Sequence, residues 1–190
     1  MNDIHWYIRP VIIISGLLLL SYCKPTNNKQ VLNKYFFTQN NKVYYKNPAS
    51  NNKQVLLQGA NPEHFRLLPD TAGKIPEEIT PYAADCMNVY YKNSRLEGCL
   101  PDRFQVLGNG FARDDEKVFF KDKTLAGVTA KEFKVLGNFY GKDKSALWFG
   151  KQTVKGNFNL SELTVIDGYF SKDANTVFMN NKNRLQALPG

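Results

Sequence analysis

Apolar and polar residues alternate in short runs along the chain, and one seven-residue run returns several times. It consists of an acidic turn residue, three intervening residues, an aliphatic residue and two bulky apolar residues, as in Asp114–Phe120. Close copies begin at Asp85, Asp143 and Asp173, and a weaker copy begins at Gln39. A turn residue followed by β-branched and aromatic residues is typical of a short strand entered from a tight turn.

The run recurs at a nearly constant interval. Its aliphatic residues lie 46, 29, 29 and 30 residues apart, at Val43, Val89, Val118, Leu147 and Val177. An aromatic residue precedes each by seven positions, and a glycine follows the middle three by nine positions, at Gly98, Gly127 and Gly156. Matched features at an interval near 29 residues indicate a tandem repeat.

Each unit is expected to contain three short strands and one turn of helix. One strand is predicted over Phe133–Tyr140, a second is the run of aliphatic and aromatic residues, and a third lies near Thr124–Gly127. Thr129 and Glu132 form a Thr-x-x-Glu capping box, which predicts a helix start. Asn61 and Asn159 occupy the same position in other units. The predicted fold class is all-β, a series of antiparallel meanders or hairpins, with a helical signal segment before it.

The repeats divide residues 35–190 into units of about 35–78, 79–109, 110–138, 139–168 and 169–190. The first unit is longer, because insertions are expected near Lys46–Asn52 and over Pro69–Pro81. The last unit is truncated and is expected to cap the array, since repeat arrays commonly end in atypical units.

The Asp-x-x-x-Val-aromatic-aromatic core, the glycine and the Phe-x-Val-Leu-Gly-Asn joint at Phe133–Asn138 resemble the DKNYY family. This is a bacterial repeat family often found on predicted lipoproteins. The resemblance covers roughly Tyr35–Leu185, and it implies a repeat architecture. It brings no known activity and no catalytic residues.

The N-terminus predicts export. Val11–Leu20 is apolar except for Ser15 and Gly16, which is too short to span a bilayer but suits a signal peptide. Leu20–Cys23 resembles the bacterial lipoprotein signal, in which the cysteine is acylated. We therefore expect a signal peptide over 1–22, lipidation of Cys23 and a polar tether over 23–34. An ordinary cleaved signal and an uncleaved short anchor remain alternatives.

This N-terminus places the protein in the bacterial cell envelope, including the outer membrane, on the periplasmic side or at the cell surface. The net charge is +8, but the basic excess is divided evenly between the two halves of the mature chain. A generally basic surface is expected, without a dedicated nucleic-acid face. Expected partners are the membrane through the lipid, and an envelope protein, an anionic polymer or a glycan.

Two further cysteines, Cys86 and Cys99, fall on opposite sides of a predicted hairpin whose turn lies near Asn93. Facing residues of an antiparallel pair can come close enough for a disulfide, and an oxidising envelope would favour one. The alternative is a pair of buried free thiols. Two cysteines and the distant His64 do not form a zinc site.

The aromatic pairs suggest a binding surface. Neighbouring strand residues point to opposite faces, so the aliphatic residue and the second aromatic are expected to face the core together. The first aromatics would then form a ladder on the other face, consisting of Tyr44, Tyr90, Phe119, Trp148 and Phe178. Packing between repeats is the alternative to an exposed stripe that binds sugars.

Catalytic and metal-binding patterns are not evident in the sequence. The repeated Asp residues lack the dense spacing of a calcium loop, and His64 lacks the context of a catalytic motif. We therefore expect a non-enzymatic scaffold or binding module without cofactor or metal. The alternative function is binding of an anionic polymer or glycan.

Overall fold

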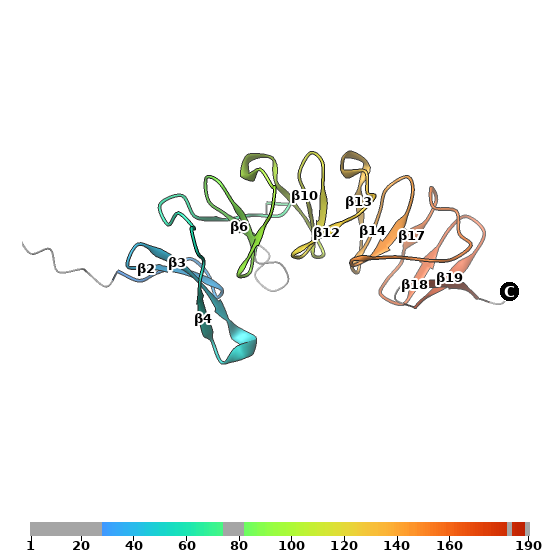
Figure 1. Ribbon diagram of the computed structural model, residues 1–190. Coiled ribbons are helices and arrows are strands. Elements are labelled where there is room, and N and C mark those ends of the chain that lie inside the picture. The colour runs from blue at the N-terminus through green and yellow to red at the C-terminus, as the bar shows by residue number, and fades with distance from the viewer. Residues whose placement is uncertain (1–27, 74–81, 182–183, 189–190) are drawn as a thin grey trace, which may run out of the picture.

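Five antiparallel sheets make up the part of the chain that the computed structural model describes, which is residues 28–73, 82–181 and 184–188. Each sheet has four strands, and consecutive strands are paired in sequence order. The sheets follow one another in an elongated row, from β2 and β3 at one end to β18 and β19 at the other (Figure 1). The prediction of an all-β tandem repeat is confirmed.

The strands are short throughout. The first sheet contains β1 (Gln30–Val31), β2 (Phe36–Gln39), β3 (Lys42–Asn47) and β4 (Lys53–Leu56). The second contains β5 (Arg66–Leu67), β6 (Tyr82–Ala84), β7 (Val89–Tyr91) and β8 (Ser94–Leu96). The third contains β9 (Gln105–Gly108), β10 (Phe111–Arg113), β11 (Val118–Phe120) and β12 (Lys123–Leu125). The fourth contains β13 (Lys134–Gly137), β14 (Tyr140–Lys142), β15 (Leu147–Phe149) and β16 (Gln152–Thr153). The fifth contains β17 (Thr164–Val165), β18 (Phe170–Lys172), β19 (Val177–Asn181) and β20 (Arg184–Ala187).

The strand predicted over Phe133–Tyr140 is in fact two strands, β13 and β14, so a sheet has four strands instead of three. Gly137, Asn138 and Phe139 form a tight turn between them, with φ values of 98°, 49° and 64°. Backbone in this left-handed region cannot continue a strand. As a result, β9 belongs to the predicted unit 79–109 but pairs with β10, which belongs to the predicted unit 110–138.

A single turn of 3-10 helix precedes the third and fourth sheets, at η2 (Pro101–Arg103) and η3 (Ala130–Glu132). The predicted capping box is wrong, because the Thr129 side chain makes no capping hydrogen bond. The Thr129 backbone N–H instead donates to Asp143 Oδ2 over 2.8 Å, and Glu132 pairs with Lys144.

The insertions of the first unit extend its hairpin and its connection. The first adds the turn η1 (Pro48–Ser50) between β3 and β4. Part of the second lies along the third sheet, where Asp70 forms a parallel bridge with Val106 and the Thr71 N–H donates to the Val106 carbonyl over 2.9 Å.

Within the described residues the core is divided among four clusters, and each cluster joins two neighbouring sheets. The aliphatic residue of one sheet packs in the same cluster as the first aromatic of the next. These pairs are Val43 with Tyr90, Val89 with Phe119, Val118 with Trp148, and Leu147 with Phe178. The hydrophobic effect therefore stabilises the contact between units as well as the units themselves.

The expected signal peptide, Cys23 and the first residues of the tether lie outside the described residues. In the described part of the chain, no helix is both long and apolar enough to cross a membrane.

Candidate functional site

The predicted ladder of first aromatics is not a solvent-facing stripe. Tyr90, Phe119, Trp148 and Phe178 are between 1% and 6% exposed. Tyr44 is half-buried and stacks on Phe37, with ring centroids 5.1 Å apart. The alternative of packing between repeats is therefore what the structure shows for Tyr90, Phe119, Trp148 and Phe178, because each of them fills the core that the preceding sheet leaves open.

The repeated aspartates hold turns, as their position predicts. In each of Asp85, Asp114, Asp143 and Asp173, Oδ1 accepts hydrogen bonds from the backbone N–H groups two and three residues later. In three of them Oδ2 also accepts an N–H from the preceding helical-turn segment, over 2.8 to 3.0 Å. The donors are Asn61, Thr129 and Asn159, so these carboxylates join neighbouring units.

In Asp85 and Asp143, hydrogen bonds lower the pKa by more than burial raises it. Burial alone would raise the pKa of Asp143, but the N–H groups of Thr129, Ser145 and Ala146 and the Ser145 hydroxyl lower it below its usual value. Asp85 behaves in the same way, with the Tyr90 hydroxyl as an additional donor. The carboxylates are therefore ionised structural acceptors, which is a role distinct from acid–base catalysis.

At two of the positions that precede these aspartates, a cation ties one unit to the next one. Arg113 Nη1 donates to the Ala130 carbonyl over 2.9 Å. Lys142 Nζ donates to the carbonyls of Leu160, Ser161 and Leu163 over 2.7, 3.2 and 3.2 Å. Burial, together with the charge of Lys134, lowers the pKa of Lys142. The recurrent charges therefore stabilise the array.

The predicted disulfide between Cys86 and Cys99 is wrong, and both residues are free thiols. The hairpin pairing ends at Val89 and Leu96, and Cys86 lies in the exposed turn that Asp85 forms. Cys99 is buried, and burial raises the pKa of its thiol to about 11. It is therefore protonated at neutral pH.

His64 is exposed in the turn before Phe65. Within residues 28–73, 82–181 and 184–188, no three His, Cys, Asp or Glu residues are grouped so as to hold a metal ion.

A hollow between the third and fourth sheets exposes aromatic surface. It has a volume of about 390 Å³ and is lined by Phe120, Lys121, Phe139, Phe149, Gly150, Lys151 and Gln152. The Phe120 and Phe139 rings meet edge to face with centroids 6.3 Å apart. Lys121 Nζ lies 5.2 Å from the Phe120 ring centroid. The size is within the range of small-ligand sites.

Phe139 contributes to this hollow from a strained backbone. Its φ is +64° and it is 37% exposed, whereas Gly110 holds the equivalent turn position one unit earlier with φ +83°. A left-handed conformation costs an L-residue roughly 1–2 kcal/mol, and strain of this kind is concentrated at functional sites. The sequence interpretation missed the hollow because it placed Phe139 in a strand and the second aromatics in the core.

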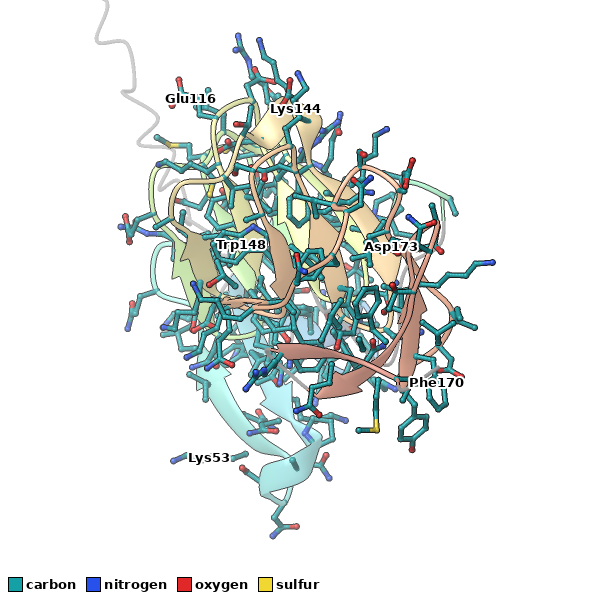
Figure 2. All side chains as sticks on the ribbon, turned by 90° about the vertical axis from the view of Figure 1, so that its right-hand side faces the viewer. Lys53, Glu116, Lys144, Trp148, Phe170 and Asp173 are labelled. Atoms are coloured by element: carbon teal, nitrogen blue, oxygen red, sulfur yellow. The ribbon has the colours of Figure 1, made fainter. Side chains whose placement is uncertain are left out.

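A second depression lies at the opposite edge, where the helical turn η3 meets the Asp143 turn. It has a volume of about 460 Å³ and is lined by four lysines, two acids and two further residues: Lys131, Lys134, Lys142, Lys144, Glu132, Asp143, Leu160 and Ser161. In Figure 2, Lys144 and Glu116 lie at one edge of the molecule and Lys53 lies at the other. Internal partners already engage Lys142, Asp143 and the Lys144–Glu132 pair. Among the described residues, Lys131 and Lys134 therefore supply the unpaired positive charge of this depression.

No family model, curated protein or solved structure matched the chain.

Proposed function

We propose that this protein is a non-enzymatic binding module of the bacterial cell envelope, anchored in the membrane by a lipid on Cys23. The resemblance of its repeats to the DKNYY family and its lipoprotein-type N-terminus support this proposal. The repeat array then serves as a rigid extension that presents binding surfaces away from the membrane.

The observation that carries this proposal is that the recurrent polar groups are used within the array. The carboxylates of Asp85, Asp143 and Asp173 accept backbone N–H groups, and the cations of Arg113 and Lys142 donate to carbonyls. A catalytic group needs a free proton or lone pair directed at a substrate. These groups are engaged in contacts within the array, which favours the exposed surface as the place where the protein binds a partner.

Fatty-acid labelling tests the anchor. Cells expressing the full chain should incorporate an alkyne-tagged fatty acid into it, and Cys23→Ser should abolish the label and release the protein from the membrane fraction. Cys86→Ser is the matched control, because Cys86 is an exposed thiol elsewhere in the chain. Label that persists in the Cys23→Ser variant would contradict the proposal.

A second candidate function is binding of an acidic glycan, and the hollow around Phe139 favours it. Sugar rings pack their apolar faces on aromatic side chains, and the carboxylates of an acidic sugar pair with lysine. The hollow combines both features, since Phe120, Phe139 and Phe149 form its wall and Lys121 and Lys151 lie beside them. This set of aromatics differs from the ladder of first aromatics that the sequence suggests as a binding surface, most of which the structure buries.

Binding assays separate sugar recognition from simple charge attraction. The full chain should bind polygalacturonate more tightly than polyphosphate, and Phe139→Ala should reduce polygalacturonate binding about 10-fold, the equivalent of 1.4 kcal/mol. Tyr169→Ala is the matched control, because Tyr169 is an exposed aromatic, 74% accessible, in the turn before β18. Equal binding of both polymers, unchanged in Phe139→Ala, would refute glycan binding at the hollow.

A further inference from the structure

Two lysines face each other across the fourth sheet. Lys134 on β13 is directly opposite Lys142 on β14, and both side chains line the depression beside η3. The Cβ atoms of facing residues lie roughly 4.5–5.5 Å apart, and like charges at such a pair are destabilising. Burial and the charge of Lys134 together lower the pKa of Lys142, which agrees with this close approach. The free protein therefore holds two cations together at a cost in free energy.

This lysine pair is a departure from the repeat. In the other four sheets the equivalent facing pair contains at most one cation, and the pairs are Gln30 with Thr38, Arg66 with Ala84, Gln105 with Arg113, and Thr164 with Lys172. In the third sheet the neutral partner is also an acceptor, since Gln105 Oε1 accepts a hydrogen bond from Arg113 Nε over 3.2 Å. Formation of the sheet therefore does not require the second lysine.

The rest of the depression adds to the positive charge. Lys131 and Lys144 also line it, whereas the third unit has Asp102 and Asp115 at the positions 29 residues earlier. Four lysines and two acids give the lining a net charge of +2. Among the described residues, Lys131 and Lys134 are exposed and have neither an ion pair nor a hydrogen bond. Two ammonium groups are therefore available to a ligand.

We propose that this depression binds the phosphate group of a phosphomonoester. Such a group carries about −1.5 to −2 charges at pH 7 and has three acceptor oxygens, so it balances the net charge of the lining. Lys131 and Lys134 donate to those oxygens. Lys142 Nζ already donates to three carbonyls, so it contributes its charge. A phosphate beside Lys134 and Lys142 replaces their mutual repulsion by two attractions.

The lining favours phosphate over the other common anions. A carboxylate brings a single negative charge and matches the planar fork of arginine, and no arginine is among the described residues that line this depression. Lysine binds phosphate as a point charge. The same lining residues include no aromatic ring on which a sugar or a base would stack. The volume of about 460 Å³ leaves room for the group that carries the phosphate.

The phosphate site is separate from the hollow around Phe139, because the two linings share no residue. The proposal rests neither on the lipid anchor nor on glycan binding at that hollow. The phosphate could belong to a soluble phosphorylated compound or to the head group of a lipid, and the experiment below distinguishes these two sources.

Calorimetric titration of the full chain in mild detergent and at low salt, with methyl phosphate as the ligand, tests the site. We expect a dissociation constant of roughly 0.1–1 mM. Lys131→Gln and Lys134→Gln should each weaken binding about 10-fold, whereas Lys134→Arg should bind as the wild type does because it keeps the charge. Lys53→Gln is the matched control, since it removes the same charge from an exposed lysine at the opposite edge of the molecule (Figure 2).

Thermal melts give a second readout. Methyl phosphate should raise the melting temperature of the wild type, because a ligand that binds only the folded state stabilises it, and it should have little effect on Lys134→Gln. Without ligand, Lys134→Gln should melt no lower than the wild type, since it removes a like-charge pair. A lower melting temperature of the free variant would contradict the repulsion on which the proposal rests.

Three results of the titration would overturn the proposal: no binding of methyl phosphate, equal binding of the singly charged dimethyl phosphate, or an equal loss of affinity in Lys53→Gln and Lys134→Gln. The two binding sites fail separately, because Lys134→Gln should keep polygalacturonate binding and Phe139→Ala should keep methyl phosphate binding. Tighter binding of glycerol phosphate than of soluble dihexanoyl phosphatidate identifies a soluble ligand, and the reverse identifies a lipid head group. Binding of neither would refute a phosphomonoester site.

Discussion

Removing one inter-unit carboxylate tests whether the aspartates fasten neighbouring repeats. Asp143 accepts four hydrogen bonds: the Ser145 N–H, the Ser145 hydroxyl and the Ala146 N–H on Oδ1, and the Thr129 N–H on Oδ2. Asp114 is the natural control. Among the described residues, its carboxylate accepts only the Glu116 and Lys117 N–H groups of its own turn, over 2.9 and 2.7 Å.

The additional hydrogen bonds of Asp143 determine how much more its loss should lower the free energy of unfolding than the loss of Asp114. A hydrogen bond to a charged group contributes about 1.5–3 kcal/mol, and part of this is regained when water reaches the freed donors. We expect Asp143→Ala to lower the free energy of unfolding by about 3–4 kcal/mol and Asp114→Ala by about 1–2 kcal/mol. Urea unfolding at pH 7, followed by the fluorescence of Trp148, measures both. Equal losses would refute a separate inter-unit contribution.

The same carboxylate makes stability depend on acid. The folded-state pKa of Asp143 lies below the unfolded value near 3.9, so the unfolded chain binds more protons as the pH falls. The stabilisation is therefore complete above about pH 5 and is lost as the pH falls through the folded pKa. Urea midpoints at pH 7, 5, 4 and 3 should fall steeply for the wild type and less steeply for Asp143→Asn. Parallel curves would show that the Asp143 charge does not contribute.

Three further measurements follow from the core and the thiols. Trp148→Phe should change stability by less than about 1 kcal/mol, since the buried Nε1–H has no hydrogen-bond partner among the described residues, whereas Trp148→Ala should cost about 3–5 kcal/mol; similar losses would contradict this. Thiol labelling of native protein should modify Cys86 rapidly and Cys99 slowly, and rapid labelling of both would show that Cys99 is accessible. Phe139→Gly should leave stability within about 1 kcal/mol of the wild type, because relief of the left-handed strain offsets the lost Phe120 contact; a larger loss would place Phe139 in the core.

The sequence predicts the repeat because its signals are local. An Asp before a β-branched residue and two aromatics forms the same turn and strand wherever it occurs, and the observed turns at Asp85, Asp114, Asp143 and Asp173 confirm it. The helical turn η3 begins where Thr129 and Glu132 predict a helix start, although the capping box itself does not form, and η2 was not predicted.

The errors concern features that depend on neighbouring units. A strand has two faces, and alternation alone does not show whether the second face meets solvent or another sheet. The first aromatics were therefore open to both interpretations, and contact with the preceding sheet decides the outcome. The disulfide prediction failed because the Asp85 turn removes Cys86 from the hairpin, although the pairing of Tyr90 with Arg95 continues the register in which Cys86 and Cys99 would face each other.

A departure from the repeat marks the place where we propose that the protein binds a ligand. A group that recurs at the same position in successive units tends to meet the same neighbour, and most of the aspartates and first aromatics join units in this way. Phe139 replaces a glycine-like turn residue and exposes an aromatic ring at the cost of backbone strain. This arrangement is unfavourable for an isolated array, since backbone strain and exposed apolar surface each cost free energy. A ligand at the hollow would offset that cost, which is why binding is expected there.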